Sequence, residues 1–251
     1  MPYTEVIDQE SGNTLIRVEY YQEHNPRTPT AYERFLARQG SVPQEVQDGL
    51  WNTIVYDSVS SLEPMVRVNS RYFLNRDTAK ESNHWIYSTD QLEELLAMRV
   101  GGLHCHVVTV AHVDSQKDEV RGTFVYTPAF PGRLRQNIGK DYTECYYQTA
   151  GWNEETKDYF YQLQTRTREQ HAASSQIKAP DPCSPSYSAL WVNWPSPPRP
   201  IHCLVYGQPG TGKSTFAATF PKPMLVFMFD SFGKEMPYLD PAIGLALPVA
   251  D

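Results

Sequence analysis

The sequence has few cysteines, no long apolar run and no excess of basic residues. Its four cysteines lie far apart and form no C-x-x-C pair, so we expect reduced, mostly buried thiols rather than a disulfide framework. No run approaches the roughly 18 apolar residues of a membrane-spanning helix, and Met1–Glu10 carries no basic or apolar signal. We therefore expect a protein of the cytoplasm with no membrane partner.

The charge balance also restricts the partners. The 22 lysines and arginines are outnumbered by 29 aspartates and glutamates, which gives a net charge of −7. This balance argues against a uniformly basic nucleic-acid binder, although a local basic patch is compatible with it. A zinc site at His104–His106 is disfavoured, because strand alternation puts Cys105 opposite both histidines and no second ligand pair occurs at zinc spacing.

The most specific motif lies near the end of the chain, where residues 207–214 read GQPGTGKS. They fill G-x-x-x-x-G-K-[ST] at every fixed position, which chance would produce in roughly one chain in a hundred of this length. Ile201–Tyr206 before the loop predicts a buried strand, and Ser214–Phe220 after it predicts a helix that ends at Pro221. A glycine turn before a helix is the alternative, but the complete pattern favours a site for nucleotide phosphates.

The spacing of this loop has a chemical reason. Its glycines allow positive φ and close backbone approach, so that successive N–H groups can surround a phosphate. Lys213 adds a mobile positive charge for the β- and γ-phosphates, and the Ser214 hydroxyl can bind Mg²⁺. The predicted nucleotide-binding residues are Gly207, Gln208, Pro209, Gly210, Thr211, Gly212, Lys213, Ser214 and Thr215.

Two polar residues follow predicted strands. Asp57 ends the apolar run Asn52–Tyr56, and ligands bind where parallel strands end, so Asp57 is a candidate for holding the Mg²⁺ of a nucleotide. Asp57 as a cap of the next helix is the alternative, which the glycine loop disfavours. His112 follows Leu103–Ala111 and would reach toward a γ-phosphate or a polarised water, although a solvated loop histidine explains it almost as well.

The remaining pattern predicts an α/β fold with a mainly parallel sheet and an antiparallel extension. Capping boxes are predicted at Thr30 with Glu33 and at Ser60 with Glu63, and 166–200 reads as a Ser-, Ala- and Pro-rich tail or linker outside the core. The expected helices are 30–40, 43–50, 62–76 and 89–100, with a polar loop at 77–83. The expected strands are 13–21 at an edge, 52–56, 103–111, 120–126, an antiparallel pair of 143–148 with 159–165, 201–206 and 224–230.

Five stretches together resemble the RecA-like P-loop ATPases of bacteriophages, a group associated with single-strand annealing and recombination. They are GQPGTGKSTFAATFPKP at 207–223, MLVFMFD at 224–230, TIVYDSVSSLE at 53–63, VVTVAH at 107–112 and VRGTFVYTPAFPGRLR at 120–135. The resemblance implies a three-layer RecA-like fold and a Mg²⁺-dependent ATPase acting in phage DNA recombination in the host cytoplasm. It also implies single-stranded DNA, an annealing protein and further copies of the chain as partners.

The resemblance assigns roles to particular residues. Lys213 neutralises transferred charge, Ser214 and Asp57 hold Mg²⁺, and His112 senses the γ-phosphate. The carboxylate that activates water follows the strand after the glycine-loop helix, which is Asp230 here. Glu235 is the second choice, because Asp230 is also a plausible turn residue.

A basic run follows the His112 strand and consists of Arg133, Arg135 and Lys140. The resemblance implies that Arg133 acts in catalysis, reaching the ATP site of a neighbouring subunit. Contact with DNA phosphates and a merely solvated helix face are the alternatives. A small-molecule kinase is disfavoured, because the sequence shows no arginine cluster typical of a lid.

The order of the motifs departs from that of the family, in which the glycine loop comes first. The sequence therefore resembles a circular permutant and forms a single domain. Its parts are the Walker B and sensor part at 1–194, a proline-rich joint at 195–200, the Walker A part at 201–239 and a tail at 240–251. Two alternatives stay open: a fused pair of fragments whose glycine loop swaps into a neighbouring molecule, and a nucleotide-binding interaction module that does not hydrolyse ATP.

Overall fold

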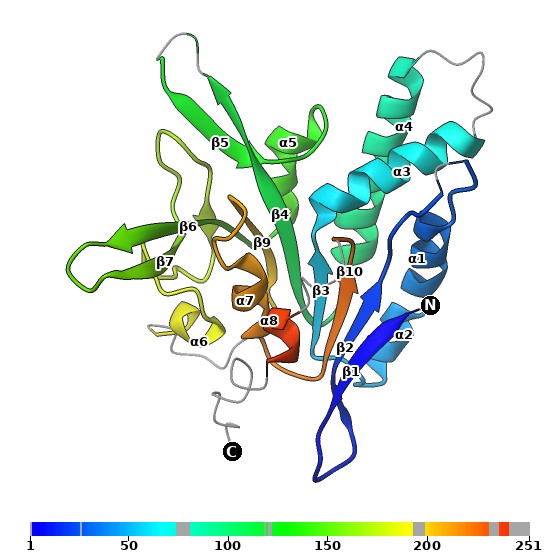
Figure 1. Cartoon of the computed structure of the whole chain (residues 1–251), viewed down its shortest axis with the longest axis horizontal. Coiled ribbons are helices and arrows are strands. Elements are labelled where there is room, and N and C mark those ends of the chain that lie inside the picture. The colour runs from blue at the N-terminus through cyan, green and yellow to red at the C-terminus, as the bar shows by residue number, and fades with distance from the viewer. Residues whose placement is uncertain are drawn as a thin grey trace.

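The computed structural model describes residues 2–25, 27–73, 81–117, 119, 122–192, 199–230 and 236–240 (Figure 1). A ten-stranded mixed sheet forms its centre. The main path of the sheet is β1 (Tyr3–Ile7), β2 (Thr14–Tyr20), β10 (Met224–Met228), β3 (Thr53–Asp57), β4 (His106–Lys117), β9 (His202–Gly207), β6 (Glu144–Asn153) and β7 (Asp158–Gln164). Off this path, β5 (Phe124–Pro128) pairs with β4, and β8 (Ser174–Ser175) pairs with β6.

The six central strands from β2 to β6 are all parallel. Antiparallel pairing adds β1 to β2, β5 to β4, and both β7 and β8 to β6. The two strands from the end of the chain lie inside this sheet, β9 between β4 and β6 and β10 between β2 and β3. The prediction of a buried strand directly before the glycine loop is therefore confirmed.

Helices cover both faces of the sheet, as Figure 1 shows. The helices are α1 (Ala31–Gln39), α2 (Val42–Gln47), α3 (Val59–Phe73), α4 (Glu81–Glu93), the π-helix η1 (Glu94–Val100), α5 (Leu134–Asn137), the 3-10 helix η2 (Ile138–Asp141), α6 (Tyr187–Leu190), α7 (Lys213–Ala218) and α8 (Met236–Leu239). One hydrophobic core contains residues of α1 to α5, and the other contains residues of α6 to α8. The fold is thus α/β, with a mainly parallel sheet between two helical layers.

The alternation of side chains along β9 explains why two cores form. Leu204 and Tyr206 pack in the core of α1 to α5, whereas Cys203 and Val205 pack in the core of α6 to α8. Successive side chains of a strand point to opposite faces, so a strand that is apolar throughout is stable only when both faces are covered. The run HCLVYG meets this requirement at the centre of the sheet.

The structure corrects the prediction that the strand at 13–21 lies at an edge. β1 pairs along β2 from Tyr3 to Ile7 and forms the edge instead. The exposed ends and mixed polarity of YTEVI gave no strand signal in the sequence. The predicted loop at 77–83 is also wrong at its end, because α4 begins at Glu81 and continues into η1.

Both predicted capping boxes are wrong. Thr30 makes no side-chain cap, and the carboxylate of Glu23 instead accepts the N–H groups of Thr30 (2.8 Å) and Ala31 (3.0 Å). Ser60 lies inside α3, where its hydroxyl accepts the N–H of His112 at 2.9 Å. Tertiary partners therefore replace the local bonds that the spacing predicted.

The segment 166–200 is not a tail where the structure describes it. Ala179, Cys183 and Leu190 are buried in the α6–α8 core, and Leu163 and Cys183 exchange two backbone hydrogen bonds of 2.9 and 3.1 Å. The segment was predicted to lie outside the core because it is rich in Ser and Pro and has only these few apolar residues. Glu235, most of the proline-rich joint and residues 241–251 of the predicted tail lie outside the described residues.

Candidate functional site

A cavity of about 570 Å³ lies where the central parallel strands end. It is lined by Asp57, Val110, His112, Gln148, Tyr161, Pro185, Pro209, Gly210, Gly212, Lys213, Ser214, Thr215, Asp230 and Pro237. The strand register explains this gathering, because Gly207 at the end of β9 pairs with His112 on one side and with Gln148 on the other. Carboxyl ends of parallel strands share one edge of a sheet, which is where ligands of α/β folds bind.

The three glycines of the loop are required for two different structural reasons. Gly210 and Gly212 have φ of 78° and 81°, a region that glycine adopts without steric cost. Gly207 is needed for space instead, because a Cβ there would lie 2.2 Å from the carbonyl oxygen of Gln148. The sequence therefore predicted the glycines correctly but did not separate these roles.

Lys213 is buried, at 6% exposure, and folds back on its own loop. Its Nζ donates to the carbonyl oxygens of Gly207 (3.0 Å) and Gln208 (2.8 Å). These carbonyls are neutral acceptors, so phosphate oxygens entering the loop would be stronger partners for the ammonium group. Thr211 fixes the loop, because its hydroxyl donates to Gln208 O (2.9 Å) and its carbonyl accepts from Gln148 Nε2 (2.7 Å).

Asp57 meets the glycine loop directly. Its Oδ2 accepts the hydroxyl of Ser214 at 2.6 Å and the hydroxyl of Tyr238, from α8, also at 2.6 Å. Burial raises the pKa of the Asp57 carboxyl, and the two hydroxyls partly oppose this rise. The carboxylate thus contacts α7 and α8, which is not the arrangement of a simple cap of α3.

The pair of Asp57 and Ser214 fits a divalent cation. A carboxylate and a hydroxyl are hard oxygen ligands of the kind that Mg²⁺ takes, and Mg²⁺ keeps waters and substrate phosphates as its other ligands. No group of three or more His, Cys, Asp or Glu residues able to hold a metal occurs among the described residues. The structure brings together both predicted metal ligands.

Asp230 also lines the cavity and is 8% exposed. Its Oδ1 accepts the hydroxyl of Ser58 at 3.1 Å and a short hydrogen bond from Ser61. Its Oδ2 is 3.9 Å from His112 Nε2. His112 is inside β4 rather than at its end, because β4 continues to Lys117 along β5, but it still lines the cavity.

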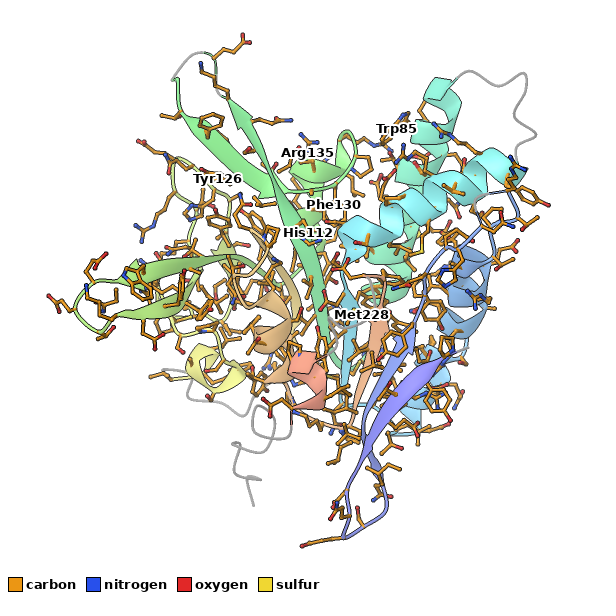
Figure 2. The ribbon with its side chains drawn as sticks, viewed as in Figure 1. Trp85, His112, Tyr126, Phe130, Arg135 and Met228 are labelled. Atoms are coloured by element: carbon orange, nitrogen blue, oxygen red, sulfur yellow. The ribbon has the colours of Figure 1, made fainter. Side chains whose placement is uncertain are left out.

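The basic run is placed elsewhere. Arg133 is 68% exposed and lies near Asp90 (3.4 Å) and Glu93 (3.2 Å). Arg135 of α5 bonds to Asp114 at 2.9 Å, and its Nε donates to the carbonyl oxygen of Phe130; both residues are labelled in Figure 2. In the described part of the chain, therefore, the structure does not bring Arg133 to the cavity of its own subunit.

Reasoning from sequence missed several residues of the cavity. Gln148 is a polar residue directly after the apolar run CYY, just as Asp57 directly follows an apolar run. The sequence predicted this run only as part of an antiparallel pair, whereas β6 also pairs in parallel with β9. Ser58 and Ser61 resemble ordinary helix-start residues, and Tyr238 lies far from any motif. Only the fold shows that these hydroxyls hold the two carboxylates.

Three comparisons with known proteins identify no relative. No protein-family model, no curated protein and no solved structure matches this chain.

Proposed function

We propose that this protein binds ATP with Mg²⁺ and hydrolyses it, as a RecA-like P-loop ATPase in circularly permuted order. One observation carries the proposal: Ser214 of the complete glycine loop donates a 2.6 Å hydrogen bond to Asp57, which is 157 positions away in the chain. Lys213 lines the same cavity. A chance glycine turn has no reason to meet a buried carboxylate from another strand.

Each loop residue has a role in binding ATP. Lys213 Nζ would exchange the carbonyls of Gly207 and Gln208 for phosphate oxygens, while the loop N–H groups donate to the same phosphates. Ser214 Oγ and the Asp57 carboxylate would hold the cation. Mg²⁺, when bound, neutralises charge on the phosphate oxygens.

Asp230 is the proposed general base. Oδ2, which lies 3.9 Å from His112 Nε2, is the atom at which Asp230 would take a proton from the attacking water. His112 lies beside this atom and would contact the γ-phosphate. Arg133 would act only on a neighbouring subunit, after leaving its acidic partners in its own chain.

The hydrogen bonds to Asp230 also favour the second candidate function, a nucleotide-binding module that does not turn over. Two hydroxyl donors hold Asp230 Oδ1 in a fixed position, which suits a carboxylate that orders water around a bound nucleotide as well as one that takes a proton. Binding of ATP·Mg²⁺ without release of phosphate would identify this function.

The role in phage recombination, with single-stranded DNA and an annealing protein as partners, rests on the resemblance alone. The permuted single domain has structural support, because β9 pairs with β4 and β6 of its own chain. A glycine loop swapped into a neighbouring molecule is not needed to complete the cavity.

The test measures binding and turnover separately. ATP·Mg²⁺ at a hundredfold excess over its Kd should stabilise the wild-type protein by about 2.7 kcal/mol, seen as a higher Tm. Lys213→Ala should remove most of this shift, whereas the control Lys117→Ala, at the far end of β4, should retain it. Phosphate release with and without single-stranded DNA then separates the ATPase from the binding module, and an unchanged wild-type Tm with ATP rejects both.

A further inference from the structure

The cavity is lined by apolar groups as well as charged ones. Its charged lining residues, such as Asp57, Lys213 and Asp230, gather where the strands end. Tyr161 of β7 and Pro185, which both lie outside the glycine loop, supply apolar surface. A nucleotide has the same division, because its phosphates are charged and its base is a flat π-system.

Tyr161 lies directly against the glycine loop. Its Cδ1 and Cε1 atoms are 3.5 and 3.8 Å from the position that a Cβ would take on Gly212. The register pairs Tyr161 with Ala150, so the strand position beside the ring carries only a methyl group. The aromatic ring therefore stands at the border between the phosphate loop and the rest of the cavity.

The neighbouring aromatic residues of the hairpin of β6 and β7 have ring or backbone partners within the hairpin. Trp152 and Tyr159 pack edge to face with ring centroids 5.0 Å apart, and Phe160 covers Gly151. No aromatic ring packs on Tyr161 within the described part of the chain, and 42% of Tyr161 is exposed. The hairpin projects from the body of the molecule beyond the edge of the central sheet (Figure 1).

We propose that Tyr161 is the base-stacking residue of this site and that it determines what the site recognises beyond phosphate. The inference rests on the proposed function, since it concerns the same bound nucleotide. Every base has a π-face, so stacking on Tyr161 favours nucleotides over inorganic polyphosphate without selecting one purine over the other. ATP and GTP should consequently bind with similar affinity.

The test compares ligands that share the phosphates but differ in the base. Calorimetry would give Kd values for ATP, GTP and inorganic triphosphate, each with Mg²⁺, on the wild-type protein and on Tyr161→Ala. Loss of one stacking surface should weaken ATP and GTP by a similar factor, roughly 5- to 100-fold, and should leave triphosphate unchanged. Tyr161→Phe should bind as the wild type does.

Two further variants keep the result interpretable. Tyr159→Ala is the matched control, because Tyr159 is on the same face of β7 and packs on Trp152 but does not line the cavity. It should leave all three affinities unchanged. Tyr161→Leu replaces the alanine variant if that protein does not fold, and the same loss of ATP and GTP binding is expected.

The possible outcomes separate this inference from the proposed function. Equal ATP affinity in the wild type and Tyr161→Ala overturns base stacking and leaves the phosphate site intact. An equal loss for triphosphate also overturns it, because the ring would then only support the glycine loop. A wild-type protein that binds neither ATP nor triphosphate overturns the proposed function itself.

Discussion

At the scale of single residues, hydroxyl groups hold both carboxylates of the cavity. Ser214 and Tyr238 donate to Asp57, and Ser58 and Ser61 donate to Asp230. Neutral hydroxyl donors orient the carboxylates without adding an opposite formal charge, so these donors do not cancel the negative charge that attracts a cation. The acidic residues were predictable from strand ends and Ser214 from the glycine loop, whereas Tyr238, Ser58 and Ser61 gave no local signal of this role.

A buried histidine outside the cavity allows a prediction on pH. His106 accepts the N–H of Ile201 at Nδ1 (3.2 Å), and its Nε2 is 3.3 Å from the Tyr187 hydroxyl. Burial, with a smaller contribution from His202, lowers the pKa of His106 from 6.5 to about 4. The native state therefore binds this proton less readily than the unfolded chain does.

The sign of the effect follows from that difference. The contribution of neutral His106 to the free energy of unfolding is fully present above pH 6.5. It is lost as the pH falls toward 4, by about 3 kcal/mol in total. His106→Asn keeps an acceptor near Nδ1 but does not titrate, so the free energy of unfolding should depend less on pH in this window. Urea unfolding of the wild type and His106→Asn from pH 7 to pH 4 measures this pH dependence. Parallel pH profiles of the two free energies of unfolding would contradict the assignment to His106.

At the scale of elements, the position of β9 sets the geometry of the cavity. β9 pairs with β4 and β6, and these pairings place His112, Gly207 and Gln148 in one row across three strands. The glycine loop begins at the end of this row, so the loop and the neighbouring strands are held by one set of backbone hydrogen bonds. A change in the spacing of β9 and β6 should move the loop.

Gly207→Ala tests this coupling. The new Cβ would meet Gln148 O at 2.2 Å, and this backbone atom cannot rotate away as the end of a flexible side chain could. Overpacking of this kind typically costs about 1–3 kcal/mol, and β9 should also move away from β6. Denaturant unfolding measures the loss of stability, and ATP binding should weaken as well.

Gly139→Ala provides the control for this variant. Its nearest contact would be Cys145 Sγ at 3.6 Å, an ordinary van der Waals distance, so stability should change little. A Gly207→Ala protein as stable as the control would show that β9 and β6 are not held as closely as the register requires.

The elements also show what the sequence could predict. The strands β3, β9 and β10 were located correctly, because each is a mostly apolar run buried on both faces. Only the buried first half of β4 was predicted, because its second half, up to Lys117, is polar and exposed. β1 and α4 were missed or shortened, since their exposed and mixed residues give no clear period. In the segment 166–192 the apolar residues are too sparse for a periodic signal, although several pack against the sheet.

At the scale of the whole molecule, strands from the two ends of the chain are interleaved. β10 separates β2 from β3, and β9 separates β4 from β6. The 201–239 part is thus not an appendage, because two of the six central strands come from it. Chain order does not determine whether a sheet can form, provided that each strand reaches its neighbours.

Cutting the chain at 198 should therefore abolish folding of the larger piece. Residues 1–198 would lack β9 and β10. The edge of β3 that pairs with β10 and the edge of β4 that pairs with β9 would then be unpaired. We expect no cooperative thermal transition by circular dichroism for this fragment alone. Co-expression with residues 199–251 should restore the transition and, if the proposed function is right, the ATP-dependent rise in Tm. The co-expressed pair controls for the cut itself, and a cooperative transition in the isolated 1–198 fragment would show that it forms a domain without the glycine-loop strand.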